Sequence, residues 1–98
     1  LIRSQDTAVG AWVVIGILQG LEEMPRIKIP VLDVFGSGDW TFTLWGAPER
    51  KQQIEKIPGS AQIEVAGAKH FFEDKEEELL GIIVTFLDKT FRARSVAN

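Results

Sequence analysis

Two segments of the chain are almost continuously apolar. They read AVGAWVVIG at residues 8–16 and IPVLDVFG at residues 29–36. A strand inside a parallel sheet is covered on both faces, so it lacks the alternation of polar and apolar residues seen in half-exposed strands. We therefore predict a buried strand in each segment. A third segment, AQIEVAG at residues 61–67, does alternate and predicts a half-exposed strand near an edge of the sheet.

Helical spacing of apolar positions appears in three other segments. Residues 17–24 can form a short helix that ends before Pro25. Residues 44–57 place apolar side chains on one helical face and polar ones, Arg50 among them, on the other. Residues 74–94 carry the broadest apolar stripe, with acids in the first turns and Lys and Arg in the last, an order that complements the helix dipole. The stripe consists of Leu79, Leu80, Ile83, Val84, Phe86, Leu87 and Phe91.

The order of the predicted elements is strand, helix, strand, helix, strand, helix. Such alternation is typical of an α/β fold in which helices cross over between parallel strands. We expect a small three-layer α/β unit with about three parallel strands, in which residues 1–98 form a single domain. A domain of this size leaves a large share of its surface in water, and its outer strands present unpaired backbone groups. We therefore expect a homodimer, formed through a sheet edge or an apolar rim.

The charged residues argue against several classes of function. The net charge is −3, and Lys and Arg are scattered without a basic stripe, which disfavours nucleic-acid binding. There is no cysteine and only one histidine, so disulfides, thiolate metal sites and multi-histidine metal sites are excluded, and we expect no cofactor. The apolar stretch at residues 8–18 is about half as long as a membrane span. We expect a soluble protein, cytoplasmic by default, whose start at Leu1 indicates a fragment or a processed product.

Candidate chemistry lies in the loops that follow two of the predicted strands. The strand at 29–36 runs into GSGDW, which places Asp39 just beyond its end, and the strand at 61–67 runs into GAKHFF, which does the same for His70. Functional groups of parallel sheets gather at the carboxyl ends of the strands. If the two strands are neighbours, the acid can fix the tautomer of the imidazole and stabilise its charged form during proton transfer. The alternatives are a turn aspartate and a solvated loop histidine.

The residues around these two positions resemble the C-terminal part of the α/β-hydrolase superfamily, and the nearest likeness is to bacterial hydrolase-like proteins of poorly characterised function. The resemblance is carried by IPVLDVFGSGDW, APER, PGSAQIEVAGAKHFF and the acid-led terminal helix, and it covers most of the chain. In that superfamily the triad acid follows a strand ending in glycine, and the triad histidine follows the next strand, often within Gly-x-x-His-Phe. The resemblance implies a truncated hydrolase-like domain with Asp39 at the acid position and His70 at the histidine position.

The chain lacks the rest of that catalytic apparatus. The family's nucleophile lies upstream in Gly-x-Ser-x-Gly, and none of Ser4, Ser37, Ser60 and Ser95 stands in that pattern. The family's oxyanion-hole loop also lies upstream, and acyl transfer requires both a nucleophile and a group that holds the oxyanion. The resemblance therefore implies a non-catalytic dimerising or interaction module. The alternative is a fragment of an esterase-like serine hydrolase, completed by missing sequence or by another chain, so the sequence leaves open whether the protein is an enzyme.

Other residues suggest structural or binding roles. Asp33 interrupts an apolar strand, and a buried carboxylate needs a cation or hydrogen bonds, so we expect Lys28 or an arginine beside it, or else a subunit interface. Trp12 is expected in the core. Five further aromatic residues lie near strand ends and can line a small-molecule pocket or an association surface, because aromatic side chains are enriched in both. They are Trp40, Phe42, Trp45, Phe71 and Phe72.

Overall fold

The part of the chain that the structure describes forms a three-stranded parallel sheet with a helix on each face. The computed structural model describes residues 10–17 and 28–97, with side chains placed as far as Arg92. The elements are β1 (Trp12–Ile15), β2 (Val31–Gly36), α1 (Thr41–Glu55), β3 (Ala61–Val65) and α2 (Glu76–Ala97). The strands lie in the order β1-β2-β3, and both pairings are parallel. The predicted α/β class, with its three parallel strands, is confirmed.

The boundaries of the elements differ from those predicted. Strand β1 begins only at Trp12, and helix α1 begins three residues before the predicted start and ends two residues before the predicted end. Helix α2 starts later and continues further than the apolar stripe indicated. The short helix predicted at residues 17–24 falls, apart from Ile17, outside the described residues.

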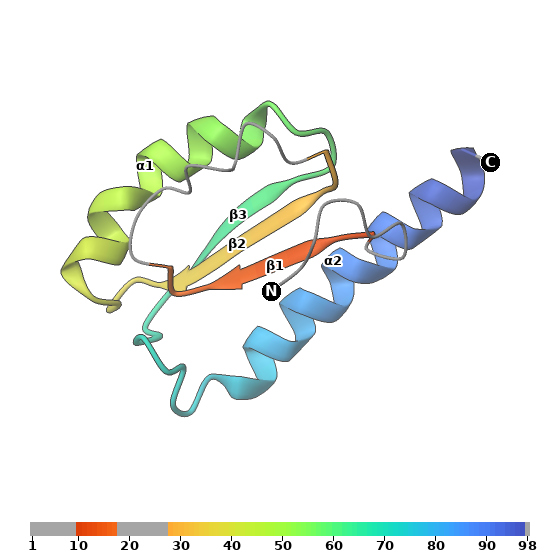
Figure 1. Ribbon diagram of the computed structural model, residues 1–98. Helices are drawn as coiled ribbons and strands as arrows, with labels where there is room; N and C mark the ends of the chain where they lie inside the picture. Colours follow the sequence, from red (N-terminus) through yellow and green to blue (C-terminus); the bar gives the residue numbers. More distant parts are fainter. Residues whose placement is uncertain (1–9, 18–27, 98) are drawn as a thin grey trace.

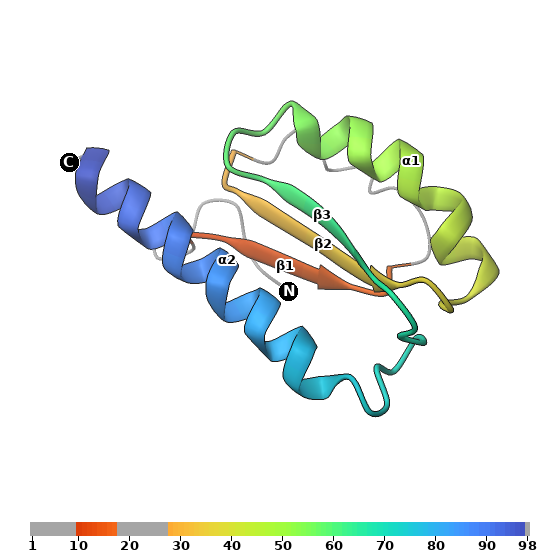
Figure 2. The same ribbon diagram turned by 180° about the vertical axis from the view of Figure 1, so that it is seen from behind.

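The two helices form the outer layers of the molecule. Helix α1 covers one face of the sheet and α2 covers the other (Figures 1 and 2). All six residues of β2, the central strand, are buried. Alternate side chains of β2 therefore serve different layers: Leu32 and Val34 belong to the cluster that α2 completes, whereas Val31 packs with Ile54 and Ile57 beside α1. This burial on both faces explains why β2 lacks polar alternation.

The α2 layer contains the larger hydrophobic cluster. Its buried members are Leu32, Val34, Val65, Ala68, Phe72 and Phe86. The α1 layer has a smaller apolar cluster, against which Trp12 is partly buried, as expected for a core residue. Much of the remaining contact between α1 and the sheet is polar.

That polar contact is a buried ion pair between α1 and β2. The Nε–H of Arg50 donates to Asp33 Oδ2 at 2.7 Å, and neither side chain has any exposed surface. The Nε2–H₂ group of Gln62, on β3, donates to the same Asp33 oxygen and to the carbonyl of Ala47, both at 2.8 Å. The prediction that an arginine lies beside Asp33 is confirmed. The assignment of Arg50 to an exposed polar face was wrong, because the register of α1 turns this side chain toward the sheet.

Candidate functional site: an aspartate–histidine pair at the strand ends

Both loops that carry candidate residues leave the same end of the sheet (Figure 1). They are joined by three hydrogen bonds: Ser37 N–H to the Val65 carbonyl at 3.0 Å, Gly38 N–H to the Ala68 carbonyl at 2.9 Å, and Gly67 N–H to Ser37 Oγ at 2.8 Å. Strands β2 and β3 are neighbours, which is the condition on which the expected meeting of Asp39 and His70 depended. The two loops therefore form one connected structure at this end of the sheet.

A glycine allows the loops to approach this closely. A Cβ atom on Gly36 would lie 2.0 Å from the carbonyl oxygen of Ala68, a distance that no side chain tolerates. The residue at the end of β2 is thus restricted to glycine by the backbone of the next loop. This contact brings the segment that follows β3 over the end of β2.

Within these loops, the side chains of Asp39 and His70 are in direct contact. His70 Nδ1 lies 2.8 Å from Asp39 Oδ1, and the Asp39 side chain is completely buried, whereas the His70 side chain is 18% exposed. The backbone N–H of Trp40 also donates to Asp39 Oδ1, at 2.7 Å, and the N–H of Gly36 approaches Oδ2 at 3.5 Å. The carboxylate is therefore fixed by its own loop as well as by the imidazole.

This geometry determines which nitrogen of the imidazole is free. An ionised carboxylate accepts hydrogen bonds and donates none, so the proton of a neutral imidazole in this contact resides on Nδ1. Nε2 is then the unprotonated nitrogen, which can accept a proton from another group. When Nε2 takes that proton, the adjacent carboxylate stabilises the resulting positive charge.

Neighbouring groups hold the His70 ring in place. The Trp40 ring stacks on it with a centroid separation of 3.5 Å and an interplanar angle of 13°, and Phe71 meets it edge-on at 4.9 Å. Gly16, just after β1, also lies against the pair: a Cβ there would be 3.0 Å from the His70 ring and 3.4 Å from Asp39 Oδ2. All three strand ends thus contribute to the surroundings of the imidazole.

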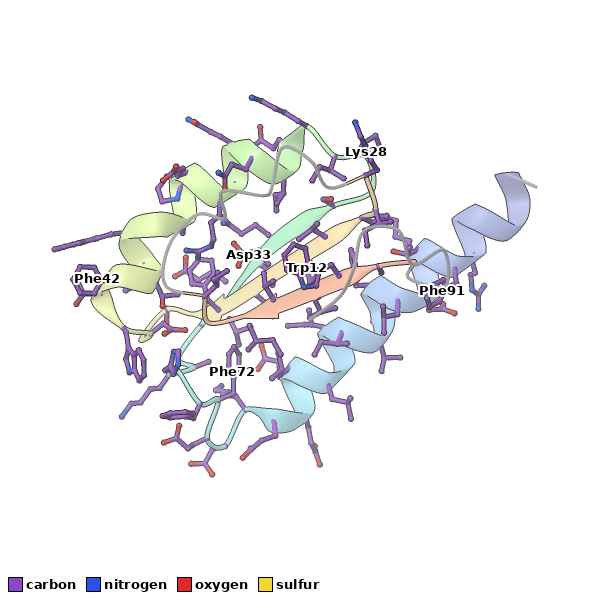
Figure 3. The ribbon with its side chains drawn as sticks, viewed as in Figure 1. Trp12, Lys28, Asp33, Phe42, Phe72 and Phe91 are labelled. Atoms are coloured by element: carbon purple, nitrogen blue, oxygen red, sulfur yellow. The ribbon has the colours of Figure 1, made fainter. Side chains whose placement is uncertain are left out.

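Phe72 anchors the loop that carries His70. Its ring is buried in the α2-side cluster, below the sheet in Figure 3. Its backbone adopts a left-handed conformation with φ of 55°, which is unfavourable for a bulky residue, and Asp74 follows with φ of 62°. The suggestion that Phe72 lines a pocket or an association surface is therefore not supported, because the ring packs in the core.

The other four aromatic residues of the predicted group are exposed. Each of these residues has between half and three quarters of its surface accessible, and the four are Trp40, Phe42, Trp45 and Phe71. Phe42 and Trp45 contact each other edge-to-face on α1, with centroids 5.6 Å apart, and Phe42 points away from the sheet in Figure 3. Of these four, Trp40 and Phe71 contact the His70 ring, whereas Phe42 and Trp45 contact each other on α1.

The sequence pattern does not predict three of these contributions. It places Gly16 only at the end of a strand, and it favours Trp40 as a residue of a pocket or association surface rather than as the ring that stacks on His70. The roles of Arg50 and Gln62 in holding α1 against Asp33 had no sequence signal beyond the unpaired carboxylate itself. Stacking and close backbone approach depend on three-dimensional proximity, which residue order does not encode directly.

Within residues 10–17 and 28–97, no group of three or more carboxylate and imidazole side chains is placed to hold a metal ion. In the same part of the chain, no helix has the length and hydropathy needed to cross a membrane.

No family model matches the chain, and no curated protein or solved structure is significantly similar to it. Evidence for a function of this chain therefore comes from the geometry of the two loops that carry Asp39 and His70.

Proposed function

We propose that this chain provides the acid–histidine half of a hydrolase centre of the α/β-hydrolase type. The observation that carries the proposal is the 2.8 Å contact between His70 Nδ1 and Asp39 Oδ1, with the Asp39 side chain fully buried. This is the relation that acid and histidine have in serine hydrolases, where the acid orients the imidazole and the imidazole moves the proton.

The wider arrangement favours this role over a turn aspartate and a solvated histidine. The two residues are separated by 31 positions and belong to loops after neighbouring parallel strands. A turn aspartate satisfies its oxygens within its own loop, and a solvated histidine needs no buried carboxylate. Here the carboxylate is shared between its own loop and the imidazole, and the imidazole is further held by the Trp40 ring.

In the proposed chemistry, Nε2 of His70 removes the proton from a hydroxyl group as that oxygen attacks an acyl carbon. The imidazolium then returns the proton to the leaving group, so the imidazole is regenerated. In this proposal the nucleophile comes from other sequence, because the two serines whose side chains the structure describes are already engaged. Of the serines, Ser37 accepts a hydrogen bond from the Gly67 N–H, and Ser60 accepts one from the Val31 N–H beside the other end of the sheet. Both hydroxyls are therefore used structurally.

The test is hydrolysis of p-nitrophenyl acetate by the purified chain at neutral pH. With water in place of the missing hydroxyl, a competent pair gives slow hydrolysis, and we expect the rate above background to fall at least about tenfold in His70→Ala and in Asp39→Asn. Lys69→Ala is the matched control, because Lys69 is the exposed neighbour of His70 and should leave the rate unchanged. Equal rates in the wild type, His70→Ala and Asp39→Asn would refute the acid–base role.

A second candidate is a non-catalytic module that associates with itself. It is favoured by the large apolar side chains that remain exposed, which include Leu80, Val84 and Phe91 on α2. Exposed apolar surface of this kind commonly marks an interface between proteins. The solution mass of the chain separates the cases: a dimer without ester hydrolysis fits the module alone, and a monomer refutes it.

A further inference from the structure

Helix α2 has an apolar stripe that the sheet does not cover. Leu80 is 61% exposed, Val84 55% and Phe91 48%, although each lies on the same helix as the core residue Phe86. Leu87, between them, is only partly buried. The four residues Leu80, Val84, Leu87 and Phe91 follow one another at spacings of four, three and four residues. This spacing matches the a and d positions of a coiled coil, whose apolar seam faces a partner helix.

Helix α2 is long enough to pair with another helix along the stripe, which extends about 16 Å from Leu80 to Phe91. Helix α2 has 22 residues, which corresponds to a length of about 33 Å. Its C-terminal part projects past the end of the sheet in both views (Figures 1 and 2), and Phe91 lies in this part (Figure 3). The sheet therefore covers only one side of α2 and leaves the flank that carries the stripe accessible.

The charges of α2 indicate the orientation of a partner helix. Its first turn contains three acids, Glu76, Glu77 and Glu78. Its last turns carry three basic residues, Lys89, Arg92 and Arg94, and one acid, Asp88, which pairs with Arg92 at 3.0 Å, so this end has a net positive charge. A parallel copy of α2 would place the acidic turns side by side. An antiparallel copy places each acidic end next to a basic end and also opposes the two helix dipoles. The charge order thus fits a second copy of this helix in the antiparallel orientation.

We infer that two copies of this chain associate through an antiparallel pairing of α2 with α2. The two-fold axis passes between Val84 and Leu87, so that Leu80 of each copy faces Phe91 of the other, and Val84 faces Leu87. An interface of this kind is isologous, because the same surface is used by both copies. The inference rests on the self-association proposed above as the second candidate, and it is independent of the chemistry of His70.

The first test compares two neighbouring substitutions by light scattering coupled to size-exclusion chromatography. The wild type is expected at twice the chain mass of 10.9 kDa. Val84→Lys should be a monomer, whereas Thr85→Lys should remain a dimer, because Thr85 is also exposed and β-branched but lies about 100° further around the helix, off the stripe. Leu80→Lys serves as a second stripe variant, and circular dichroism checks that each variant keeps its helices.

The second test determines the orientation, and the absence of cysteine from the chain makes it unambiguous. The double variant Leu80→Cys/Phe91→Cys should oxidise to a covalent dimer, since each thiol faces its partner across the interface. Within one copy these positions are about 16 Å apart along the helix, too far for a disulfide. Each single-cysteine variant should remain uncrosslinked, because the same distance separates identical positions in an antiparallel pair.

The outcomes separate this inference from the proposals above. A dimer that persists in Val84→Lys would support self-association of the chain but refute α2 as the interface. A covalent dimer in either single-cysteine variant would refute the antiparallel orientation. A monomeric wild type would refute both self-association and this inference, and it would leave the effect of His70→Ala on ester hydrolysis as a separate question.

Discussion

The Asp39 carboxylate is positioned by its own loop as well as by the imidazole. Its Oδ1 atom accepts the Trp40 N–H at 2.7 Å, while the His70 contact approaches the same oxygen at 2.8 Å. The carboxylate therefore requires little rearrangement to receive the imidazole. Preorganisation of this kind is what a proton-transfer site needs, since dipoles that are already aligned need not reorganise during the reaction.

The first prediction concerns the tautomer of His70. At a pH where the imidazole is neutral, ¹⁵N NMR of the wild type should show the proton on Nδ1, because Asp39 provides its acceptor. In Asp39→Ala that acceptor is lost, and the proton should redistribute toward Nε2. Glu73→Ala is the control, since Glu73 is an exposed acid three residues after His70. A wild-type imidazole protonated on Nε2 would contradict the predicted orientation.

The second prediction concerns the contact between the two loops. Gly36→Ala should lower the free energy of unfolding by about 1–3 kcal/mol or more, because the new methyl group would overlap the backbone of Ala68. Gly38→Ala is the comparison: its Cβ would be 3.3 Å from the same carbonyl oxygen, which a small shift can relieve. Urea denaturation measures both. Equal stability of the two variants would mean that the loops can separate without cost.

At the scale of the elements, α1 is joined to the sheet by charge as much as by apolar packing. The Arg50 guanidinium lies over the Phe35 ring, with Cζ 5.3 Å from its centroid, and donates to the Thr43 carbonyl at 3.0 Å. Asp33 Oδ1 and Arg50 Nη2 have no hydrogen-bond partner within the described part of the chain, although both are buried. We expect such an incompletely satisfied buried pair to fix the position of the helix while adding little net stability.

The third prediction tests that distinction with a double-mutant cycle. Arg50→Met should destabilise the fold by about 3–5 kcal/mol, because it leaves the Asp33 carboxylate buried without a cation. The double variant Asp33→Leu/Arg50→Met should be more stable than Arg50→Met alone, since it removes the unpaired charge as well. The free energies are obtained from urea denaturation. Strict additivity of Arg50→Met and the single variant Asp33→Leu in the double variant would show that the ion pair contributes no coupling.

The fourth prediction concerns the loop between β3 and α2. Phe72 and Phe71 are adjacent in sequence, yet Phe72 is 2% exposed and Phe71 is 71% exposed. Phe72→Ala should therefore cost about 3–5 kcal/mol, whereas Phe71→Ala should change the unfolding free energy by no more than about 0.5 kcal/mol. Thermal or urea unfolding of the two variants gives the comparison. Similar losses would indicate that the Phe72 ring does not anchor the loop.

At the scale of the whole molecule, the parallel sheet could be predicted from the sequence, because burial of β2 on both faces leaves a nearly continuous apolar run at residues 29–36. Such an apolar run without polar alternation is typical of a strand covered on both faces, and parallel strands bring Asp39 and His70 to one end of the sheet. The position of Arg50 could not be predicted, since helical periodicity alone treats a charged residue as exposed. The stacking of Trp40 on His70 could not be predicted either, because it joins loops that are distant in sequence.

The same central strand makes the two layers interdependent. Val34 belongs to the cluster beside α2, whereas Val31 packs with Ile54 beside α1, and both lie on β2. Loss of either layer would expose one face of this strand to water. The two clusters lie on opposite faces of the sheet, and β2 remains buried on both faces only while both clusters are packed.

The fifth prediction follows from this shared strand. Urea unfolding can be monitored by tryptophan fluorescence, which is sensitive to Trp12 on the α1 side, and by far-UV circular dichroism, to which α2 contributes as the longest helix. We expect the two methods to give the same midpoint. Ile54→Ala on the α1 side and Phe86→Ala on the α2 side should each lower both midpoints together, because each truncation removes packing from a layer that β2 shares. If Ile54→Ala shifted only the fluorescence transition, the α1 layer would unfold on its own, and the sheet with α2 would be the stable unit.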